Sequence, residues 1–257
     1  MAHVMSQNMH NITDQEWQVR CDLAACYRLF VKFGWTDSIF THLSARVPGQ
    51  PEQYLINPYG LLFPEIKASN LIKVDFDGNV IDGEIPYNDA GHEIHSAVLK
   101  ARPEVNAVLH SHTRAGIAVS CMQEGLLPLS QQSGEIIDLV AYHEYGYADA
   151  ENPEECERLG ADMASGKWLM IMFNHGLLSA GRSIAEAFYL LYTLENACKV
   201  QVDVMASGAK MKTADPAVLD LLGQFSRPEG DRVLPQAQML WEAECRLLER
   251  NDPSYLE

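Results

Sequence analysis

Two histidines with one residue between them could bind a metal ion together. His110-Ser111-His112 closes an apolar run, residues 105–112, that predicts a β-strand. Side chains two positions apart on a strand point to the same face, so the two imidazoles can converge on one point. Paired histidines also occur at protein surfaces and in hydrogen-bonded cores. The spacing is typical of a metal site but does not establish one.

His175 is a third imidazole at the end of a predicted strand. It stands in Asn174-His175-Gly176, between apolar runs at residues 168–173 and 177–180. Loops cluster at strand ends, and binding sites are usually built there. A turn histidine with no ligand role explains the position equally well, because nothing in the spacing links it to the histidine pair. Both interpretations stay open on the sequence pattern alone.

One helix followed by two β-hairpins is expected in the first third of the chain. The capping-box sequence T-D-Q-E at residues 13–16 precedes apolar residues at helical spacing, which end at Gly34. Alternating and apolar runs around turn residues then predict one hairpin over residues 39–56 and another over residues 71–81. Antiparallel sheet is therefore expected to dominate this part of the chain.

Helices and strands alternate through the rest of the chain. Helical spacing predicts helices over residues 88–101, 113–121, 153–164, 183–207 and 236–250. Further strands are expected at residues 105–112, 168–173 and 177–180, and the pattern is weakest over residues 216–228. The mixture predicts an α/β fold with three layers, α/β/α, in which helices cover a central and mainly antiparallel sheet.

A single domain is the simplest organisation for a chain of this length. The 257 residues permit one domain or two, and hydrophobic residues make up 47%, which is enough to close a large core. We expect one domain over residues 1–257. Its core should span about residues 15–207, and a helical extension should follow at about residues 216–257.

Charge and composition exclude several classes of partner. The 35 acidic and 19 basic residues leave a formal charge of -16, which repels nucleic acid and anionic lipid. No apolar run reaches the roughly 18 to 20 residues that cross a bilayer, and the polar first dozen residues do not resemble a signal peptide. Six cysteines without a C-x-x-C pair are typical of buried reduced thiols. A soluble cytoplasmic protein is expected, with no nucleic-acid or membrane partner.

Four motifs of this chain resemble the class II aldolase/adducin family. They are A-R-P-E-V-N-A-V-L-H-S-H-T-R at residues 101–114, N-H-G-L-L at 174–178, T-H-L-S-A-R-V-P-G at 41–49 and L-I-N-P-Y-G-L-L-F at 55–63. With the sequence E-N-A at residues 195–197, they spread the resemblance over roughly residues 15–205. The resemblance implies the fold of that family.

The resemblance also implies a metal ion and a reaction class. In the family's aldolases two strand histidines and the histidine of the H-G pair bind a catalytic zinc, and by motif these are His110, His112 and His175. Three neutral imidazoles leave one zinc position open for water or substrate, and other divalent ions such as Mn²⁺ suit similar sites. Such an ion acts as a Lewis acid during carbon–carbon cleavage. A homotetramer with sites at subunit boundaries is implied as well.

The sequence departs from the aldolase pattern at the position of the family's acid/base glutamate. Gly91 stands there, and His95 and the downstream Arg-Pro fix the alignment. Glu93 or His92 would reach the site if the helix start were remodelled. Both also suit ordinary roles, because an acid in the first turn interacts favourably with the helix dipole and histidines occur on helix faces.

A phosphorylated substrate is not expected. The family's aldolases hold a substrate phosphate with a Gly-Asn loop and a Ser-Ser pair, and these places read Thr41-His42 and approximately Asp89-Ala90 here. An aspartate repels a phosphate dianion, and phosphate loops rely on approachable backbone N–H groups. His42, in a strand predicted at residues 39–47, is a candidate proton donor or carboxylate anchor, or else a hydrogen-bonded core histidine.

A cluster of tyrosines is a further candidate for proton transfer. Tyr142, Tyr145 and Tyr147 fall where the family's aldolases present a tyrosine to the neighbouring subunit's site. Aromatic packing at an interface is the simpler explanation of the cluster. We take Tyr145 as the candidate catalytic residue among them.

Two functions of different classes remain. The first is a metal-dependent carbon–carbon lyase acting on a small, non-phosphorylated hydroxy or keto compound, with His42, Glu93 and Tyr145 as candidate catalytic residues. Decarboxylation by the same metal is another version of it. The second is an adducin-like binding module without turnover, because adducin heads also replace the glutamate. The complete histidine triad favours the first function, and metal content would discriminate the two.

Overall fold

One sheet of eight strands lies at the centre of the part of the chain that the structure describes. The computed structural model describes residues 12–83, 86–146, 153–164, 166–226 and 234–257. The strands are β1 (Leu43–Val47), β2 (Gln50–Ile56), β3 (Ile72–Asp75), β4 (Val80–Asp82), β5 (Ala107–Ser111), β6 (Val140–His143), β7 (Leu169–Met172) and β8 (Gly176–Gly181). Their order across the sheet is β4-β3-β2-β1-β5-β8-β7-β6.

Antiparallel pairing dominates this sheet, as the hairpin-rich sequence predicts. Every neighbouring pair is antiparallel except β6 and β7, which run parallel. β5 and β8 pair with each other, with His110 opposite Leu178 and Ser111 opposite Leu177. The strand that carries His110, and that His112 follows, therefore lies beside the strand that His175 precedes.

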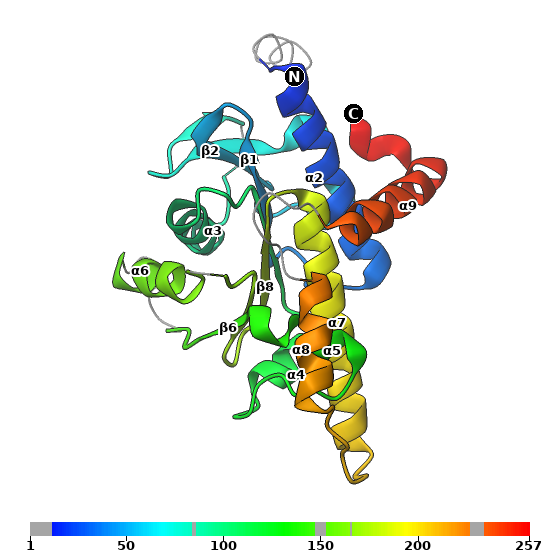
Figure 1. Cartoon of the computed structure of the whole chain (residues 1–257). Helices are drawn as coiled ribbons and strands as arrows, with labels where there is room; N and C mark the ends of the chain where they lie inside the picture. Colours follow the sequence, from blue (N-terminus) through cyan, green and yellow to red (C-terminus); the bar gives the residue numbers. More distant parts are fainter. Residues whose placement is uncertain (1–11, 84–85, 147–152, 165, 227–233) are drawn as a thin grey trace.

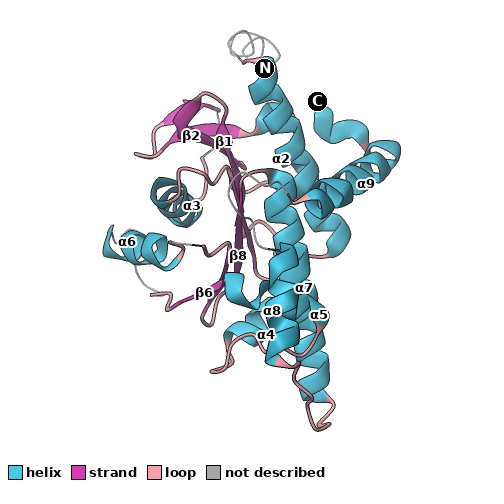
Figure 2. Cartoon of the chain, in the orientation of Figure 1, coloured by secondary structure: helices cyan, strands magenta, loops and turns pink. Residues whose placement is uncertain are grey.

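Helices cover both faces of the sheet. They are α2 (Asp14–Phe33), α3 (Asp89–Ala101), α4 (Arg114–Ser120), α5 (Gln131–Ile136), α6 (Pro153–Asp162), α7 (Ile184–Ala206), α8 (Pro216–Ser226) and α9 (Pro235–Asn251). α3 and α6 lie on one face and α2, α4 and α7 on the other, as Figure 1 and Figure 2 show with the sheet nearly edge-on. α9 packs against α2 and α7. The prediction of three layers, α/β/α, is confirmed.

Side-chain caps start the two longest helices where the sequence predicts. Thr13 Oγ1 accepts a hydrogen bond from Glu16 N at 3.1 Å, and Gly34 ends α2 with a φ of 68° in the left-handed region. Ser183 Oγ accepts from Glu186 N at 3.2 Å and caps α7 in the same way. α7 then packs on β5, β7 and β8. Local capping thus fixes where each helix meets the sheet.

β1 begins at Leu43, later than the predicted strand at residues 39–47. Ser38 has a φ of 52° and Thr41 a φ of 75°, so the backbone before Leu43 is irregular. A strand requires negative φ values, which these residues lack. His42 therefore lies just before β1 and not within it.

α8 begins the helical extension expected at about residues 216–257, although no local pattern marks its bounds. It lies in the weakly patterned region and packs against α5. A Cβ on Gly134 of α5 would lie 2.8 Å from Leu222 and 3.0 Å from Leu219, so this glycine permits the close approach of the two helices. The contacts that define α8 are distant in sequence, and a local pattern does not reveal them.

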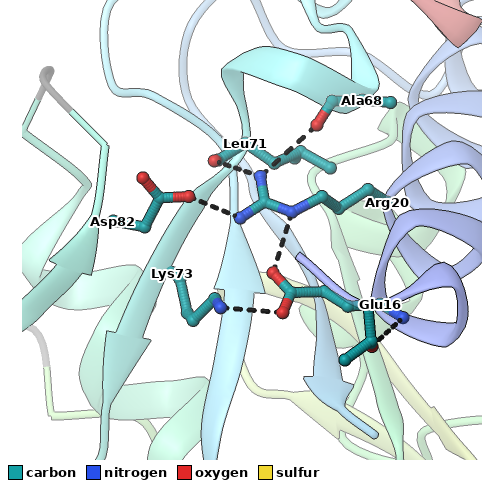
Figure 3. A network of polar contacts seen from close by, with 7 residues as sticks. Glu16, Arg20, Ala68, Leu71, Lys73 and Asp82 are labelled. Atoms are coloured by element: carbon teal, nitrogen blue, oxygen red, sulfur yellow. Dashed lines mark hydrogen bonds and ion pairs between the residues drawn. The ribbon is translucent and has the colours of Figure 1, made fainter. Parts of the chain in front are cut away.

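A buried network of charged side chains joins α2 to the β3–β4 hairpin (Figure 3). Arg20, which is 1% exposed, donates to Glu16 Oε1 at 3.0 Å and to Asp82 Oδ2 at 2.8 Å. Lys73 donates to the second Glu16 oxygen at 2.7 Å. The remaining contacts of the guanidinium are to the carbonyl oxygens of Ala68 and Leu71. Two cations face two carboxylates, the pairing that buried charges require.

Five of the six cysteines lie on helices, and Cys121 follows the end of α4. All six are free thiols, and Cys21, Cys26 and Cys198 are buried. Burial raises the pKa of these three thiols, so they pack as uncharged side chains. Among the described helices, none combines the length and the apolar character that crossing a membrane requires.

Candidate metal centre

His110, His112 and His175 converge on one point, although the first and last are 65 residues apart in sequence. The Nε2 atom of His112 lies 2.8 Å from that of His110 and 2.8 Å from that of His175. The Nε2 atoms of His110 and His175 are 3.3 Å apart. The structure therefore brings together the three histidines that the motifs single out.

A tight turn between β7 and β8 brings His175 to the histidine pair. Asn174 adopts a φ of 55°, in the left-handed region where asparagine is among the better tolerated residues. A Cβ on Gly176 would lie only 2.4 Å from the carbonyl oxygen of Ser111, so β8 can approach β5 this closely only with glycine there. In the Asn-His-Gly sequence, the asparagine thus adopts the left-handed turn, the histidine joins the triad and the glycine permits the close approach of the two strands.

Hydrogen bonds to the outer nitrogens orient two of the rings. His110 Nδ1 is 2.9 Å from the carbonyl oxygen of Leu177, and His112 Nδ1 is 3.0 Å from Asp37 Oδ2. Both oxygens are acceptors, so each Nδ1 carries a proton, and Nε2 is the nitrogen of each ring that faces the triad and would bind a metal ion. Asp37 was not singled out from the sequence. Partners of this kind commonly fix the orientation of metal-binding histidines.

A divalent metal ion fits this arrangement. Bonds of about 2.0–2.1 Å to a tetrahedral zinc place two ligand nitrogens roughly 3.3 Å apart, and the separations here are 2.8 to 3.3 Å. Burial lowers the pKa of His110 well below its ordinary value, and neighbouring histidines lower it further. Burial likewise lowers the pKa of His175 to about 4. Both rings are neutral near pH 7, which is the form that binds metal.

Glu195 of α7 anchors the strand end that carries the histidine pair. Its fully buried carboxyl accepts hydrogen bonds from Ser111 Oγ at 2.9 Å and from Thr113 Oγ1 at 2.7 Å. Burial raises the pKa of Glu195, while the hydrogen bonds from Thr113 and Ser111 lower it. Because Ser111 and Thr113 flank His112 in the chain, these bonds set the direction in which the backbone presents its imidazole.

A cavity of about 240 Å³ opens beside the triad. Its ten lining residues belong to the loop before β1, to the start of α3 and to the loops that follow β5, β6 and β7. Neither lysine nor arginine is among these described residues, and Asp37 is their single carboxylate. Pockets for drug-sized ligands measure roughly 300–1,000 Å³. The site therefore suits a small molecule and offers no cationic side chain to a phosphate.

His42 lines this cavity and lies against the triad. Its ring is stacked on His110, with centroids 5.1 Å apart and an interplanar angle of 25°. Its Nδ1 is 2.8 Å from His95 Nε2, and His95 Nδ1 is 2.5 Å from Ser44 Oγ. Burial lowers the pKa of His42 and of His95 well below the ordinary value, so both rings are neutral near pH 7. The sequence placed His42 in the right region, and it gave no indication of the link to His95.

Gly91, which stands where the family pattern has a glutamate, leaves room for His42. A Cβ at position 91 would lie 2.7 Å from His42 Cδ2 and 2.8 Å from its Cγ. Any larger residue at this position requires the imidazole to move. The absence of a side chain at position 91 and the placement of the His42 ring are therefore parts of one arrangement.

Tyr145 packs directly on the triad. The centroids of its ring and the His175 ring are 4.2 Å apart, and Tyr145 lines the cavity. Burial raises the pKa of Tyr145, and Glu93 raises it further through its charge. Glu93 itself does not line the cavity, so among the described lining residues only Tyr145 and His42 are predicted catalytic side chains.

His92 and Tyr142, which were also considered for proton transfer, are not among the described lining residues of the cavity. His92 is hydrogen-bonded through Nδ1 to the Tyr54 hydroxyl at 2.5 Å. Tyr142 accepts a hydrogen bond from Leu126 N at 3.1 Å and is 38% exposed. Tyr147 lies outside the described residues. His92 and Tyr142 thus have structural contacts that account for their positions.

Comparison with known proteins agrees with the fold. The family model described as the class II aldolase and adducin N-terminal domain matches residues 21–202. The chain belongs to this family. The matched span runs from α2 into α7 and includes all three histidines of the triad.

The relatives of this family member include aldolase-type proteins and adducins. A Pseudomonas aeruginosa protein whose name places it with the class 2 aldolases is 46% identical over 249 residues, which cover 95% of this chain and 94% of the relative. Mouse α-adducin is 42% identical over 192 residues, which cover 74% of this chain and 26% of the adducin. The chain thus corresponds to nearly all of the first relative and to about a quarter of the second.

Solved structures confirm the class II aldolase fold. An aldolase II superfamily protein from Pseudomonas syringae has a TM-score of 0.89 and 44% identity, covering 97% of this chain and 99% of its own. L-fuculose 1-phosphate aldolase from Glaciozyma antarctica has a TM-score of 0.80 and 28% identity, covering 94% and 92% respectively. The fold predicted from the sequence motifs is that of these proteins.

Proposed function

We propose that this chain is a metal-dependent carbon–carbon lyase acting on a small, non-phosphorylated hydroxy or keto compound. The observation that carries the proposal is the convergence of three Nε2 atoms within 3.3 Å, while the Nδ1 atoms of His110 and His112 are hydrogen-bonded elsewhere. Lone pairs that face one another this closely repel unless a cation lies between them. A core that only had to pack would gain nothing from this arrangement.

His110, His112 and His175 would hold zinc or another divalent ion such as Mn²⁺. When bound, the ion supplies a Lewis acid that polarises a hydroxyl, carbonyl or carboxylate oxygen and stabilises the negative charge that develops as a neighbouring carbon–carbon bond breaks. The three imidazoles leave a tetrahedral ion one open position. His112 and His175 also line the cavity that would admit the substrate.

Tyr145 is the proposed proton donor of this site. Its raised pKa keeps the phenol protonated near neutral pH, and its ring packs on His175 within the cavity. Glu93 would act through Tyr145, because its charge helps to raise that pKa. His42 would contact the substrate from the loop before β1, as a proton donor or as an anchor for a carboxylate.

The cavity lining supports a substrate without phosphate. The Glaciozyma relative is named for a phosphorylated sugar, and a phosphate dianion is usually held by arginine, lysine or a set of backbone N–H groups. The described lining residues include neither cation, and they include the carboxylate of Asp37. Decarboxylation of a small acid by the same metal is a second version of the proposal, since it needs the same charge stabilisation.

An adducin-like binding module is the alternative of a different class. It is supported by the 42% identity to mouse α-adducin over 192 residues. Such a module would keep the fold for association and would tolerate loss of the metal. A homotetramer is part of our proposal in either case, because Phe40 lines the cavity and is 47% exposed, where an adjoining subunit could cover it.

Elemental analysis of protein purified without added metal tests the proposal. We expect about one zinc or manganese per chain, and loss of that metal in the double variant His110→Ala/His112→Ala. His92→Ala is the matched control, because this histidine of α3 is bonded to Tyr54 and lies outside the cavity. It should retain the metal.

The outcomes separate the two classes of function. Metal that is bound by the wild type and by His92→Ala, and lost from the double variant, supports the lyase and justifies a screen of hydroxy acids, keto acids and aromatic carboxylates for cleavage. A wild-type protein without metal that also takes up none on reconstitution would exclude the lyase. The adducin-like module would then be the better account.

A further inference from the structure

Thr41 presents a hydroxyl group that no described residue satisfies. The residue lines the cavity and is 3% exposed, and its Oγ1 is buried without a hydrogen-bond partner in the described part of the chain. Its φ of 75° adds backbone strain, since a β-branched residue rarely adopts this conformation. A buried hydroxyl without a partner also destabilises a fold. A ligand with an acceptor atom would give this hydroxyl a hydrogen-bond partner and would remove the cost of leaving it unpaired.

A chain of hydrogen bonds determines which nitrogen of His42 carries the proton. The fully buried Ser44 Oγ is 2.5 Å from His95 Nδ1, and this is its one hydrogen bond among the described residues. The hydroxyl therefore donates to His95 Nδ1, which leaves the His95 proton on Nε2. That proton is donated to His42 Nδ1 at 2.8 Å. His42 then carries its own proton on Nε2, which has no acceptor within the described chain.

The remaining polar groups of the cavity also favour an anion. The side-chain oxygen of Asn88 accepts from Gly91 N at 3.2 Å, which leaves its NH₂ group as a donor at the cavity. A divalent ion held by three neutral imidazoles brings two positive charges. Asp37, the single carboxylate among the described lining residues, is already bonded to His112. Hydrogen-bond donors and positive charge are thus in excess over acceptors.

We infer that the substrate is a small hydroxy or oxo carboxylic acid, whose carboxylate accepts hydrogen bonds from Thr41 Oγ1 and His42 Nε2. The inference rests on the proposed function, because the hydroxyl or oxo oxygen is the group that the metal would polarise. A cavity of about 240 Å³ holds such an acid. Gly91 belongs to this specificity, since a side chain there would displace the His42 ring.

Calorimetric titration of the zinc-loaded protein tests this inference without relying on turnover. The probes are glycolate and ethylene glycol, which share a two-carbon skeleton and differ in the carboxylate. We expect glycolate to bind roughly tenfold more tightly or better, because only glycolate offers charged acceptor oxygens. The zinc content of each sample is measured first, so a failure to hold metal is recognised separately from a failure to bind the acid.

Two variants at one position isolate the anchoring hydroxyl. Thr41→Val keeps the shape and the β-branch but removes the hydroxyl, and it should weaken glycolate binding by roughly fivefold or more. Thr41→Ser keeps the hydroxyl and should bind glycolate within about twofold of the wild type. Nitrogen NMR of the histidine rings gives an independent readout, because His42 should carry its proton on Nε2.

Each outcome decides the matter. Equal glycolate affinity in the two Thr41 variants, equal affinity for the two probes, or a His42 proton on Nδ1 would overturn the inference while the metal site stands. A wild-type protein that takes up neither zinc nor manganese on reconstitution would remove the proposed function and this inference with it. Selective loss of glycolate binding in Thr41→Val, with zinc retained, supports both.

Discussion

Asp37 accepts a hydrogen bond from His112, with Oδ2 3.0 Å from Nδ1, across 75 residues of sequence. The carboxylate comes from the loop between α2 and β1, and the histidine follows β5. This contact selects the ring nitrogen that faces the triad and holds the ring in its plane. The loop before β1 therefore orients one of the three imidazoles as well as lining the cavity.

Removing this carboxylate should weaken metal binding. Asp37→Ala leaves His112 free to rotate and to change tautomer, so we expect zinc affinity to fall by about 10- to 100-fold. Competition with a chromogenic chelator measures the affinity. Asp77→Ala, at an exposed position in the β3–β4 turn, is the control and should match the wild type. Equal affinity of the Asp37 variant and the control would show that the contact has no orienting role.

Removing the carboxyl of Glu195 should destabilise the fold. Glu195→Ala leaves Ser111 and Thr113 without their buried acceptor, and we expect a loss of about 2–4 kcal/mol in the free energy of unfolding. Glu195→Gln keeps one acceptor oxygen and should lose less. Urea denaturation of the metal-free proteins measures both values. A loss in the alanine variant no larger than that in the glutamine variant would contradict this account.

The metal-free protein should lose stability in acid. The pKa is well below its ordinary value for His42, His95 and His110, and about 4 for His175. The unfolded chain binds protons on these histidines below about pH 6.5, whereas the folded chain does so only at lower pH. The contribution of these histidines to the free energy of unfolding is complete above about pH 6.5 and declines as the pH falls towards 4. Urea midpoints at about pH 7.5 and about pH 5 measure the decline, and His95→Asn should make it shallower.

Breaking the buried charge network should cost far more than breaking an exposed ion pair. Arg20→Ala leaves Glu16 and Asp82 without their shared cation, so we expect a loss of about 3–5 kcal/mol in the free energy of unfolding. Lys32→Ala, which breaks the more exposed pair with Glu244, should cost about 1 kcal/mol or less. Thermal and urea unfolding of the two variants give the comparison. Similar losses in the two variants would contradict the expectation that breaking a buried ion pair costs more than breaking an exposed one.

Features set by local chemistry were predictable from the sequence. The cap at Thr13 and the glycine at position 34 define α2, and alternation about turns defines the hairpins of the first third. His110 and His112 share a face because strand geometry requires it. The position of His175 beside them depends on the pairing of β5 with β8, which only the family motifs indicated.

Features that depend on contacts distant in sequence were missed or misplaced. The start of β1 was wrong because positive φ values at Ser38 and Thr41 leave no trace in an apolar pattern. Asp37 and His95 gained their roles from loop and helix packing that spacing does not encode. Glu195 did carry a signal, since it lies on a helix face between the buried Leu191 and Cys198. A charged residue on an apolar face indicates a buried polar partner.

The triad draws its ligands from places that are far apart along the chain. An ion bound by His112 and His175 would join two points separated by 63 residues, and the stretch between them contains α4, α5, β6, α6 and β7. Closing a loop of this length removes conformational freedom from the unfolded chain, by about 4 kcal/mol if it acts as a disulfide does. The ion would then serve as a cross-link. Its loss would loosen the middle of the molecule as well as the cavity.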